Sequence, residues 1–289
     1  MRLARIYQQQ PLNSGKIIHL SKEAAHHLVR VLRLDVGAEF ILFNGEGGEF
    51  KAHITSVQKN SVSAQIGIFN PVDNESSLQI ILAQTIVKPE KMDYVLQKSV
   101  ELGVTHIVPL ITERCLLPKL SPERWEKRLA HWQAILINAC EQSGRTKIPT
   151  VSRAVAFKTA LQQIKADIRV ILAPNATQTF SQLYSQQWDF QQGAAKESNR
   201  SVYTIHEDCE LSGNTAENLS AKSMVKSCYC AAVLVGPEGG WSESEMKSAL
   251  AADYLPIQLG PRILRTETAG LVALTLLQAA YGDISLNLV

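Results

Sequence analysis

The chain has 289 residues, of which 45% are hydrophobic and 19% charged. This composition is typical of a globular protein with one or two domains and excludes a disordered chain. The net charge of +2 is too small to indicate a nucleic-acid partner by itself. No apolar stretch is long enough to cross a bilayer or follows the N-terminal charges as in a signal peptide, so we expect a cytoplasmic protein.

Charge is unevenly distributed along the chain. Residues 1–35 contain six cations and two carboxylates, a net charge of +4, so the remainder carries −2. Three histidines (His19, His26 and His27) lie in the same basic segment. This pattern favours a module that binds phosphate groups, although a solvated charged face is an equally good interpretation of charge alone.

Cysteine usage gives no sign of a metal site. The five cysteines are an odd number and include no Cys-x-x-Cys pair, so we expect reduced thiols, no disulfide framework and no bound metal. The positions are Cys115, Cys140, Cys209, Cys228 and Cys230.

The N-terminal segment predicts a small β-barrel. Ser21 is placed to cap a short helix, and strands are expected at 39–44, 49–57 and 61–69, with glycines and Lys59-Asn60 at the turns. A polar segment with a proline, residues 70–77, predicts a linker. We therefore expect a basic β domain over residues 1–72 and a second domain over 78–289.

The second domain alternates strands and helices, which predicts an α/β fold with a parallel sheet. Strands are expected at 79–87, 106–111, 169–173 and 231–236, and a helix opens at Pro89 and ends at Gly103. A long helix begins at Ser121-Pro122 and ends near Gly144. Residues 186–227 are polar and aperiodic, which predicts an insertion without a catalytic role.

Two loops carry the candidate chemistry. Gly236-Pro237-Glu238-Gly239-Gly240-Trp241 follows a buried strand, and Ser242 with Glu245 forms a capping-box pattern at the next helix. Glycines at the end of a parallel strand let a ligand approach the backbone, although a tight turn alone would also use them. The loop lacks the Gly-x-Gly-x-x-Gly spacing and the phosphate-binding lysine of common nucleotide sites.

The second loop is Leu259-Gly260-Pro261-Arg262-Ile263-Leu264-Arg265, followed by a helix that we expect Thr266 to cap. Arginines at a helix N-terminus suit an anionic ligand or RNA phosphate. A surface loop with an Arg265–Glu267 ion pair is the alternative.

Together these loops resemble the SPOUT class of RNA methyltransferases, in particular the bacterial family that methylates N3 of a uridine in 16S ribosomal RNA. Three further stretches agree with this resemblance: Lys88-Pro89-Glu90-Lys91-Met92-Asp93, Glu141-Gln142-Ser143-Gly144-Arg145, and His26-His27-Leu28-Val29-Arg30-Val31-Leu32-Arg33. The likeness covers nearly the whole chain and departs from the family chiefly at the insertion.

The resemblance implies a PUA-like RNA-binding β-barrel and a C-terminal α/β methyltransferase domain with a deep trefoil knot. It also implies S-adenosylmethionine as the cofactor, a homodimer, and 16S ribosomal RNA in the small subunit as the partner. A non-catalytic RNA-binding protein and a nucleotide-dependent enzyme are the two rival functions.

The resemblance also assigns residues. Arg265 is the candidate for stabilising the anionic base, and Glu141 for orienting the substrate or relaying a proton, unless it only anchors Arg145. The expected cofactor-binding residues are Leu234, Gly236, Glu238, Gly239, Gly240, Leu259, Gly260, Ile263, Leu264, Thr266 and Ala269. The expected RNA-binding residues are Arg2, Arg5, His26, Arg30, Arg33, Lys88 and Arg145.

Overall fold

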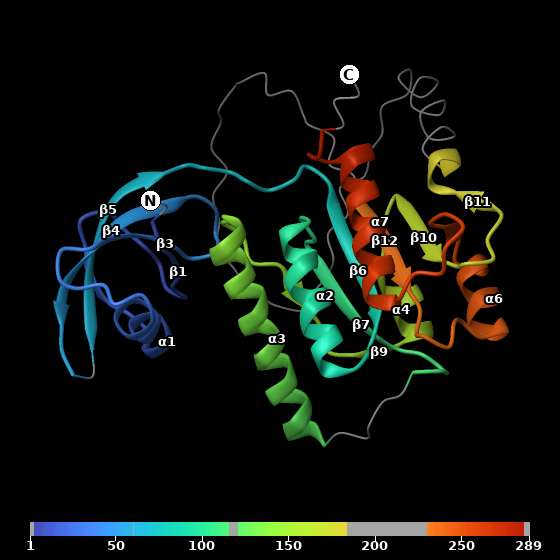
Figure 1. The fold of residues 1–289 in the computed structure, drawn as a ribbon, viewed down its shortest axis with the longest axis horizontal. Coiled ribbons are helices and arrows are strands. Elements are labelled where there is room, and N and C mark those ends of the chain that lie inside the picture. The colour runs from blue at the N-terminus through green and yellow to red at the C-terminus, as the bar shows by residue number, and fades with distance from the viewer. Residues whose placement is uncertain (1–2, 60, 116–120, 184–229, 286–289) are drawn as a thin grey trace, which may run out of the picture. The chain divides into compact units, whose positions relative to one another are not determined.

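The structure is a computed structural model that describes residues 3–59, 61–115, 121–183 and 230–285. Contacts divide the chain into two compact units (Figure 1). The first unit comprises Met1–Ser76, Pro89–His106 and Lys119–Ser152. The second unit comprises Ser77–Lys88, Ile107–Pro118 and Arg153–Val289. The domain boundaries expected from the sequence, 1–72 and 78–289, stay a prediction, and the insertion at 186–227 lies outside the described residues.

A five-stranded sheet forms the body of the first unit. Its order is β1-β3-β4-β5-β2, with β1 parallel to β3 and the other pairs antiparallel. Alternate residues of the strands point inward, and Phe40, Leu42, Ile54 and Ala64 are fully buried in one core. The strands are β1 (Arg5–Tyr7), β2 (Ile17–His19), β3 (Glu39–Phe43), β4 (Glu49–Val57) and β5 (Val62–Asn70).

The helices of the first unit begin with α1 (Lys22–His26), where the Ser21 hydroxyl accepts from the backbone of Ala24 as expected. A π-helical turn, η1 (His27–Val31), continues α1 and buries Leu28 in the core. Helices α2 (Pro89–Glu101) and α3 (Pro122–Ser143) pack against each other. Gly144 ends α3 with a φ of 90°, and the short strand β8 (Thr150–Val151) follows.

A mostly parallel sheet forms the second unit. Its strands follow the order β11-β13-β10-β12-β6-β7, and β9 pairs with β7 in parallel. The central strands β6, β12 and β10 are mostly apolar and mostly buried, as expected for strands covered on both faces. The strands are β6 (Gln79–Thr85), β7 (His106–Ile111), β9 (Val155–Ala156), β10 (Ile168–Leu172), β11 (Gln178–Thr179), β12 (Cys230–Val235) and β13 (Leu255–Gln258).

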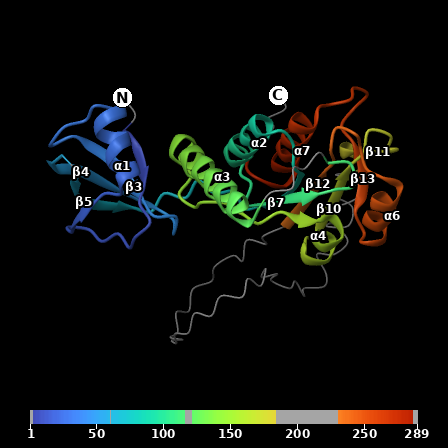
Figure 2. The same cartoon turned by 90° about the horizontal axis from the view of Figure 1, so that it is seen from below.

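Helices cover both faces of this sheet. Helix α4 (Phe157–Gln163) and the region of α6 (Glu243–Ala251) share one core with Ala83 and Leu234. Helix α7 (Thr266–Tyr281) lies on the opposite face, where its Gly270 approaches Leu82 and Val235. Figure 2 shows α4 and α7 on opposite sides of the strands. None of the described helices is both long and apolar enough to span a membrane.

The expected β-rich first segment, α/β second segment and most elements are confirmed. Strands β1, β2, β8, β9 and β11 and helix α4 were not anticipated, because they are two to seven residues long and show no periodic pattern.

Candidate functional site

The loop after β12 is fixed by its tryptophan. The Trp241 indole N–H donates to the carbonyl of Leu172, the last residue of β10, at 2.9 Å. A Cβ on Gly236 would lie 2.9 Å from the Trp241 ring, so only glycine lets the ring pack this closely. Trp241 therefore ties the end of β12 to the end of the neighbouring strand.

A second set of contacts holds the same loop from the end of β7. The expected capping box is present, with the Ser242 and Glu245 side chains each accepting from the other's backbone N–H. The other oxygen of Glu245 accepts from the backbone N–H of Glu113 at 2.9 Å, and Arg114 donates to the Gly239 carbonyl at 2.8 Å. The Ser244 hydroxyl donates to Glu113 at 2.5 Å. The loop is therefore rigidly held before any ligand binds.

The loop after β13 leaves open space beside its backbone. Gly260 has a φ of 93°, and a Cβ there would meet no atom within 4 Å. Gly240, in the other loop, has a φ of 70° and the same open surroundings. Ile263 is 85% exposed, an unusual position for a large apolar side chain unless a ligand covers it.

The two loops lie at the same edge of the sheet. Strands β12 and β13 flank β10 and both run parallel to it, so their carboxyl ends meet at one edge. Helix α7 then passes from β13 back to β12 and β6. The expected cofactor residues are thus brought together, except that Leu234 is wholly buried in the core and Thr266 is 6% exposed.

Three buried polar atoms near this edge have no hydrogen-bond partner among the described residues. They are Gln84 Oε1 and Thr85 Oγ1 at the end of β6, and Thr112 Oγ1 just after β7. A buried polar atom without a hydrogen bond costs about 1–3 kcal/mol. Each of these atoms needs a partner that the described residues do not supply, such as an ordered water or a group of a bound ligand.

Arg265 stands at the mouth of α7. It is exposed and occupies the N-cap position, so the expectation that Thr266 caps this helix is wrong by one residue. Among the described residues, its guanidinium makes no hydrogen bond or ion pair, and the alternative pairing with Glu267 is not formed. Its charge is therefore available to a ligand.

Glu141 lies in the first unit, near the end of α3. Its Oε1 accepts from the backbone N–H of Tyr7 at 2.9 Å, and its Oε2 lies 3.9 Å from His27 Nδ1. Burial raises the pKa of this carboxyl, while the Tyr7 N–H, His27 and Arg5 oppose the rise. The alternative that Glu141 anchors Arg145 is wrong, and its expected role in catalysis stays a prediction.

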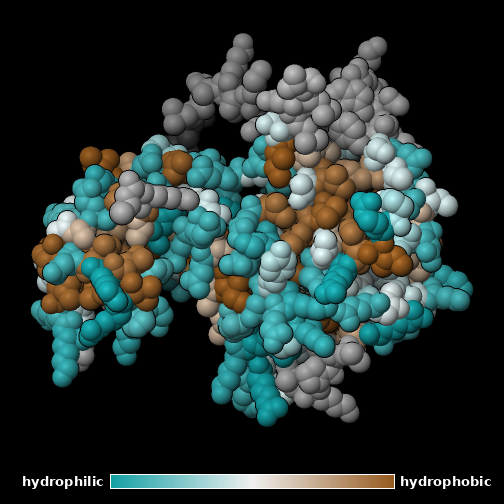
Figure 3. Space-filling view, in the orientation of Figure 1, coloured by the Kyte–Doolittle hydropathy of each residue, from teal (hydrophilic) through white to brown (hydrophobic). Residues whose placement is uncertain are grey.

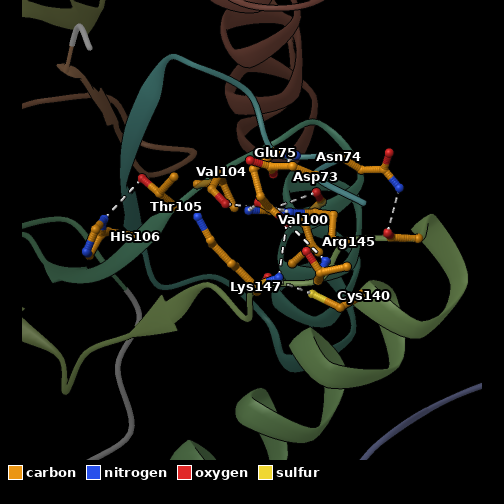
Figure 4. Close-up of polar contacts among 12 residues, drawn as sticks. Asp73, Asn74, Glu75, Val100, Val104, Thr105, His106, Cys140, Arg145 and Lys147 are labelled. Carbon is orange, nitrogen blue, oxygen red and sulfur yellow. Dashed lines mark hydrogen bonds and ion pairs between the residues drawn. The ribbon is translucent and has the colours of Figure 1, made fainter. Parts of the chain in front are cut away.

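Arg145 is buried in a polar network (Figure 4). Its guanidinium donates to Glu75 and to the carbonyls of Val100 and Val104, at 2.6–3.1 Å. Arg5 is similarly enclosed, ion-paired with Glu49 and donating to the Arg145 carbonyl. These contacts favour structural roles for both arginines over the expected contact with RNA.

The remaining RNA-binding candidates are accessible. Four of them have exposed side chains: His26, Arg30, Arg33 and Lys88. The fifth, Arg2, lies outside the described residues. Within the described ranges, no three His, Cys, Asp or Glu side chains are grouped to hold a metal ion.

Comparisons with known proteins agree with this arrangement. Residues 74–195 and 185–278 match the family model described as an RNA methyltransferase domain, and residues 20–67 match an RNA methyltransferase PUA domain. The chain belongs to the RNA methyltransferase family. The expected PUA-like N-terminal domain and α/β methyltransferase domain are thus confirmed, whereas the knot stays a prediction.

Individual relatives span the whole chain. The ribosomal RNA small subunit methyltransferase E of Buchnera aphidicola is 31% identical over 98% of this chain and 99% of its own length. The enzyme of the same name from Neisseria gonorrhoeae, solved with S-adenosylmethionine, is 33% identical with a TM-score of 0.77 and covers 98% and 100%. A Legionella pneumophila protein described as a methyltransferase, also solved with the cofactor, is 37% identical with a TM-score of 0.80 and the same coverage.

Proposed function

We propose that this protein methylates N3 of a uridine in 16S ribosomal RNA of the small subunit, with S-adenosylmethionine as the methyl donor. The observation that carries the proposal is the pair of loops at one sheet edge, with open space beside Gly240 and Gly260 and a guanidinium at Arg265 that no described residue engages. Relatives named as small-subunit ribosomal RNA methyltransferases support the substrate class. With an RNA substrate of this kind, we expect the protein to act in the bacterial cytoplasm.

The residues at this edge fit the proposed cofactor. S-adenosylmethionine carries an adenine, ribose hydroxyls, a carboxylate and an ammonium group, all of which need polar partners. The loops offer approachable backbone groups at Gly240 and Gly260, and Ile263 offers an exposed apolar surface for the adenine. The unpartnered oxygens of Gln84, Thr85 and Thr112 are further candidates for hydrogen bonds to it.

Methyl transfer to N3 of a uridine requires specific contributions from residues of this chain. The bound cofactor supplies an electrophilic methyl group on a sulfonium. N3 of uracil must lose its proton before it can act as a nucleophile, which spreads negative charge over the two flanking oxygens. We assign the Arg265 guanidinium to these oxygens, because such an interaction is strongest in the transition state. The two braced loops hold the reacting groups in a fixed orientation.

A homodimer is part of the proposal. Helix α7 carries half-buried apolar residues on its outer side, Leu271, Val272 and Leu276, in a region where hydrophobic side chains gather (Figure 3). A second copy would cover such a surface. Light scattering of the purified full-length protein should give twice the mass of one chain.

The function is tested on RNA that lacks the modification. Small subunits and free 16S RNA from a strain without this gene would be incubated with the protein and labelled S-adenosylmethionine, and the nucleosides identified by mass spectrometry. We expect 3-methyluridine at one position, in one or both substrates. Methylation of another atom or no methylation of either substrate would contradict the proposal. Cofactor binding without methyl transfer would favour the non-catalytic RNA-binding alternative.

A further inference from the structure

The first unit contains an open groove of about 1030 Å³, which lies outside the glycine loops. The segment from α1 through η1 forms one side, and the last turn of α3 forms the other. The volume is at the upper end of the range for small-ligand sites. The residues that matter for its chemistry are His27, Val31, Leu32, Asn138, Glu141 and Gln142.

The α3 side of the groove carries hydrogen-bonding groups. Asn138, Glu141 and Gln142 are spaced i, i+3 and i+4, so they share one face of the helix. Among the described residues neither the Asn138 nor the Gln142 amide is engaged, and both are exposed. Glu141 Oε1 is fixed by the Tyr7 N–H, while Oε2 lies near His27 and keeps accepting capacity.

The opposite side of the groove is apolar and has an uncommon backbone conformation. Val31 is 60% exposed and Leu32 is 40% exposed, although both lie in a protein with well-buried cores. They end the π-helical turn η1, and Arg33 directly after them has a φ of 56°. π-helical turns and left-handed non-glycine residues are concentrated at functional sites. Flat apolar surface of this kind suits the face of an aromatic ring.

The charged residues in and around the groove indicate which kind of ligand it can bind. The lining includes Arg5, which is neutralised by its ion pair with Glu49, and then one further cation, Lys22, against the carboxylates Glu23 and Glu141, so the groove has no excess of positive charge to hold an anion. Further cations, Arg30 and Arg33, are exposed on the α1–η1 segment and do not line the groove. A neutral heterocycle therefore fits the interior, and phosphates fit the rim.

We propose that this groove binds one unpaired nucleobase of the RNA, recognised by an exocyclic amino group that donates to Glu141. This inference rests on the proposed function, because it gives the RNA substrate a second contact besides the methylated base. Cytosine, adenine and guanine carry an exocyclic amino group, and uracil does not. Carboxylates accept hydrogen bonds from such groups in nucleic-acid complexes, and Asn138 and Gln142 can pair with the neighbouring ring atoms.

The test compares two unstructured RNAs on the full-length protein. Fluorescence anisotropy at one fixed salt concentration would measure the affinity for labelled oligocytidine and oligouridine of about nine nucleotides, a length within the site sizes of single-strand binders. The wild-type protein should bind oligocytidine roughly fivefold more tightly, the scale of one hydrogen bond. Equal affinities would overturn the proposal.

Three variants locate the effect. Glu141→Gln keeps the acceptor for Tyr7 but should bring the cytidine-to-uridine preference close to one. Asn138→Ala should weaken oligocytidine binding by roughly fivefold. Gln97→Ala, an exposed amide on α2 outside the groove, is the matched control and should change nothing. Unchanged affinities in the first two variants would overturn the groove as a binding site.

Methylation assays separate this inference from the proposed function. If the wild-type protein methylates 16S RNA, Asn138→Ala should raise KM for RNA and leave the single-turnover rate at saturating RNA unchanged. A fall of that rate in Glu141→Gln with unchanged RNA affinity would show that Glu141 acts in catalysis and overturn the docking role. If the wild-type protein methylates nothing, the proposed function fails, while the oligonucleotide preference still decides whether the groove reads a base.

Discussion

Arg145 and Glu75 form a buried ion pair in which Nη2 and Nε of the arginine both donate to Glu75 Oε2, at 2.6 and 2.9 Å. The other carboxylate oxygen accepts from the backbone N–H groups of Thr146 and Lys147, each at 3.1 Å. The two side chains are only 6% and 11% exposed. One carboxylate therefore satisfies four donors at the end of α3.

The first prediction concerns this pair. Arg145→Met should lower the free energy of unfolding by about 3–5 kcal/mol, because it leaves the Glu75 charge buried without its partner. Chemical denaturation followed by circular dichroism would measure the loss. Lys98→Ala, which removes a partly exposed ion pair with Glu101, is the control and should cost about 0.5 kcal/mol or less. Similar losses in both variants would show that burial adds nothing here.

The second prediction concerns pH and Glu141. Its pKa is raised above the ordinary value of 4.5, chiefly by burial, so the folded state holds this proton more tightly than the unfolded chain. The contribution of Glu141 to stability is thus fully present below its unfolded pKa and is lost as pH rises through the folded pKa.

Glu141→Gln has no proton to lose, so its stability relative to the wild type should increase as the pH rises above 4.5 and level off once the folded-state carboxyl of the wild type is ionised. Urea unfolding at several pH values would measure the difference. A constant difference, or one of opposite sign, would mean that burial does not govern this carboxyl.

The third prediction concerns the braced glycine loop. Gly236→Ala would place a methyl group 2.9 Å from the Trp241 ring and displace the indole from the Leu172 carbonyl. We expect a loss of about 1–3 kcal/mol in unfolding free energy, the scale of overpacking. Calorimetry should show weaker S-adenosylmethionine binding. Gly15→Ala is the control, because Gly15 lies in the first unit, away from this loop, and a Cβ there would meet no atom within 4 Å. It should leave cofactor affinity unchanged, and an equal loss of cofactor affinity in both variants would show that the loop after β12 is not the site.

The fourth prediction concerns Arg265. Arg265→Lys and Arg265→Ala should each lower the single-turnover methylation rate by about a hundredfold or more, the scale of a lost oxyanion donor. Lysine keeps the charge but not the planar pair of donors. Cofactor affinity should change little. A near-normal rate combined with weak RNA binding would assign Arg265 to docking.

The fifth prediction concerns the exposed cations after α1. Arg30→Gln combined with Arg33→Gln should weaken RNA binding and reduce its salt dependence by about one unit of slope per lost phosphate contact. Cofactor binding is the internal control. If the slope is unchanged, these arginines are merely solvated.

Local patterns predicted much of the fold. Apolar runs bounded by glycine or proline gave β6, β7, β10 and β12, and Pro89 and Gly144 marked helix ends that the structure places within a residue or two. The Ser242–Glu245 capping box was visible because both partners lie within one helical turn. Strand β1, only three residues long and paired with β3 some 36 positions later (Arg5 with Ile41), has no such local signal.

The site was only partly predictable, because contacts between residues far apart in the sequence leave no local pattern. Glycines that open space around the backbone are visible in the sequence, and the structure brings Gly240 and Gly260 to one sheet edge. The buried oxygens of Gln84 and Thr85 were missed, because the pair lies inside the apolar strand expected over residues 79–87 and carries no signal of its own there. Arg145 was expected to contact RNA on the strength of the family resemblance, and nothing beside it in the sequence shows that it is buried. Its partner lies 70 residues away, in a segment that looked like a free linker.

The position of Glu75 changes where the polypeptide can be divided. Residues 70–77 have the polar composition at which protein engineers usually cut between domains. A fragment starting at Gln79 would lose the only carboxylate that the described residues supply to the interior guanidinium of Arg145, and would also lose the Asn74 amide that donates to the Gly144 carbonyl. A fragment starting at Val72 keeps both of these contacts and loses at Arg145 only the bond from Arg5 to its carbonyl, so a cut on the N-terminal side of this segment preserves the Glu75–Arg145 ion pair.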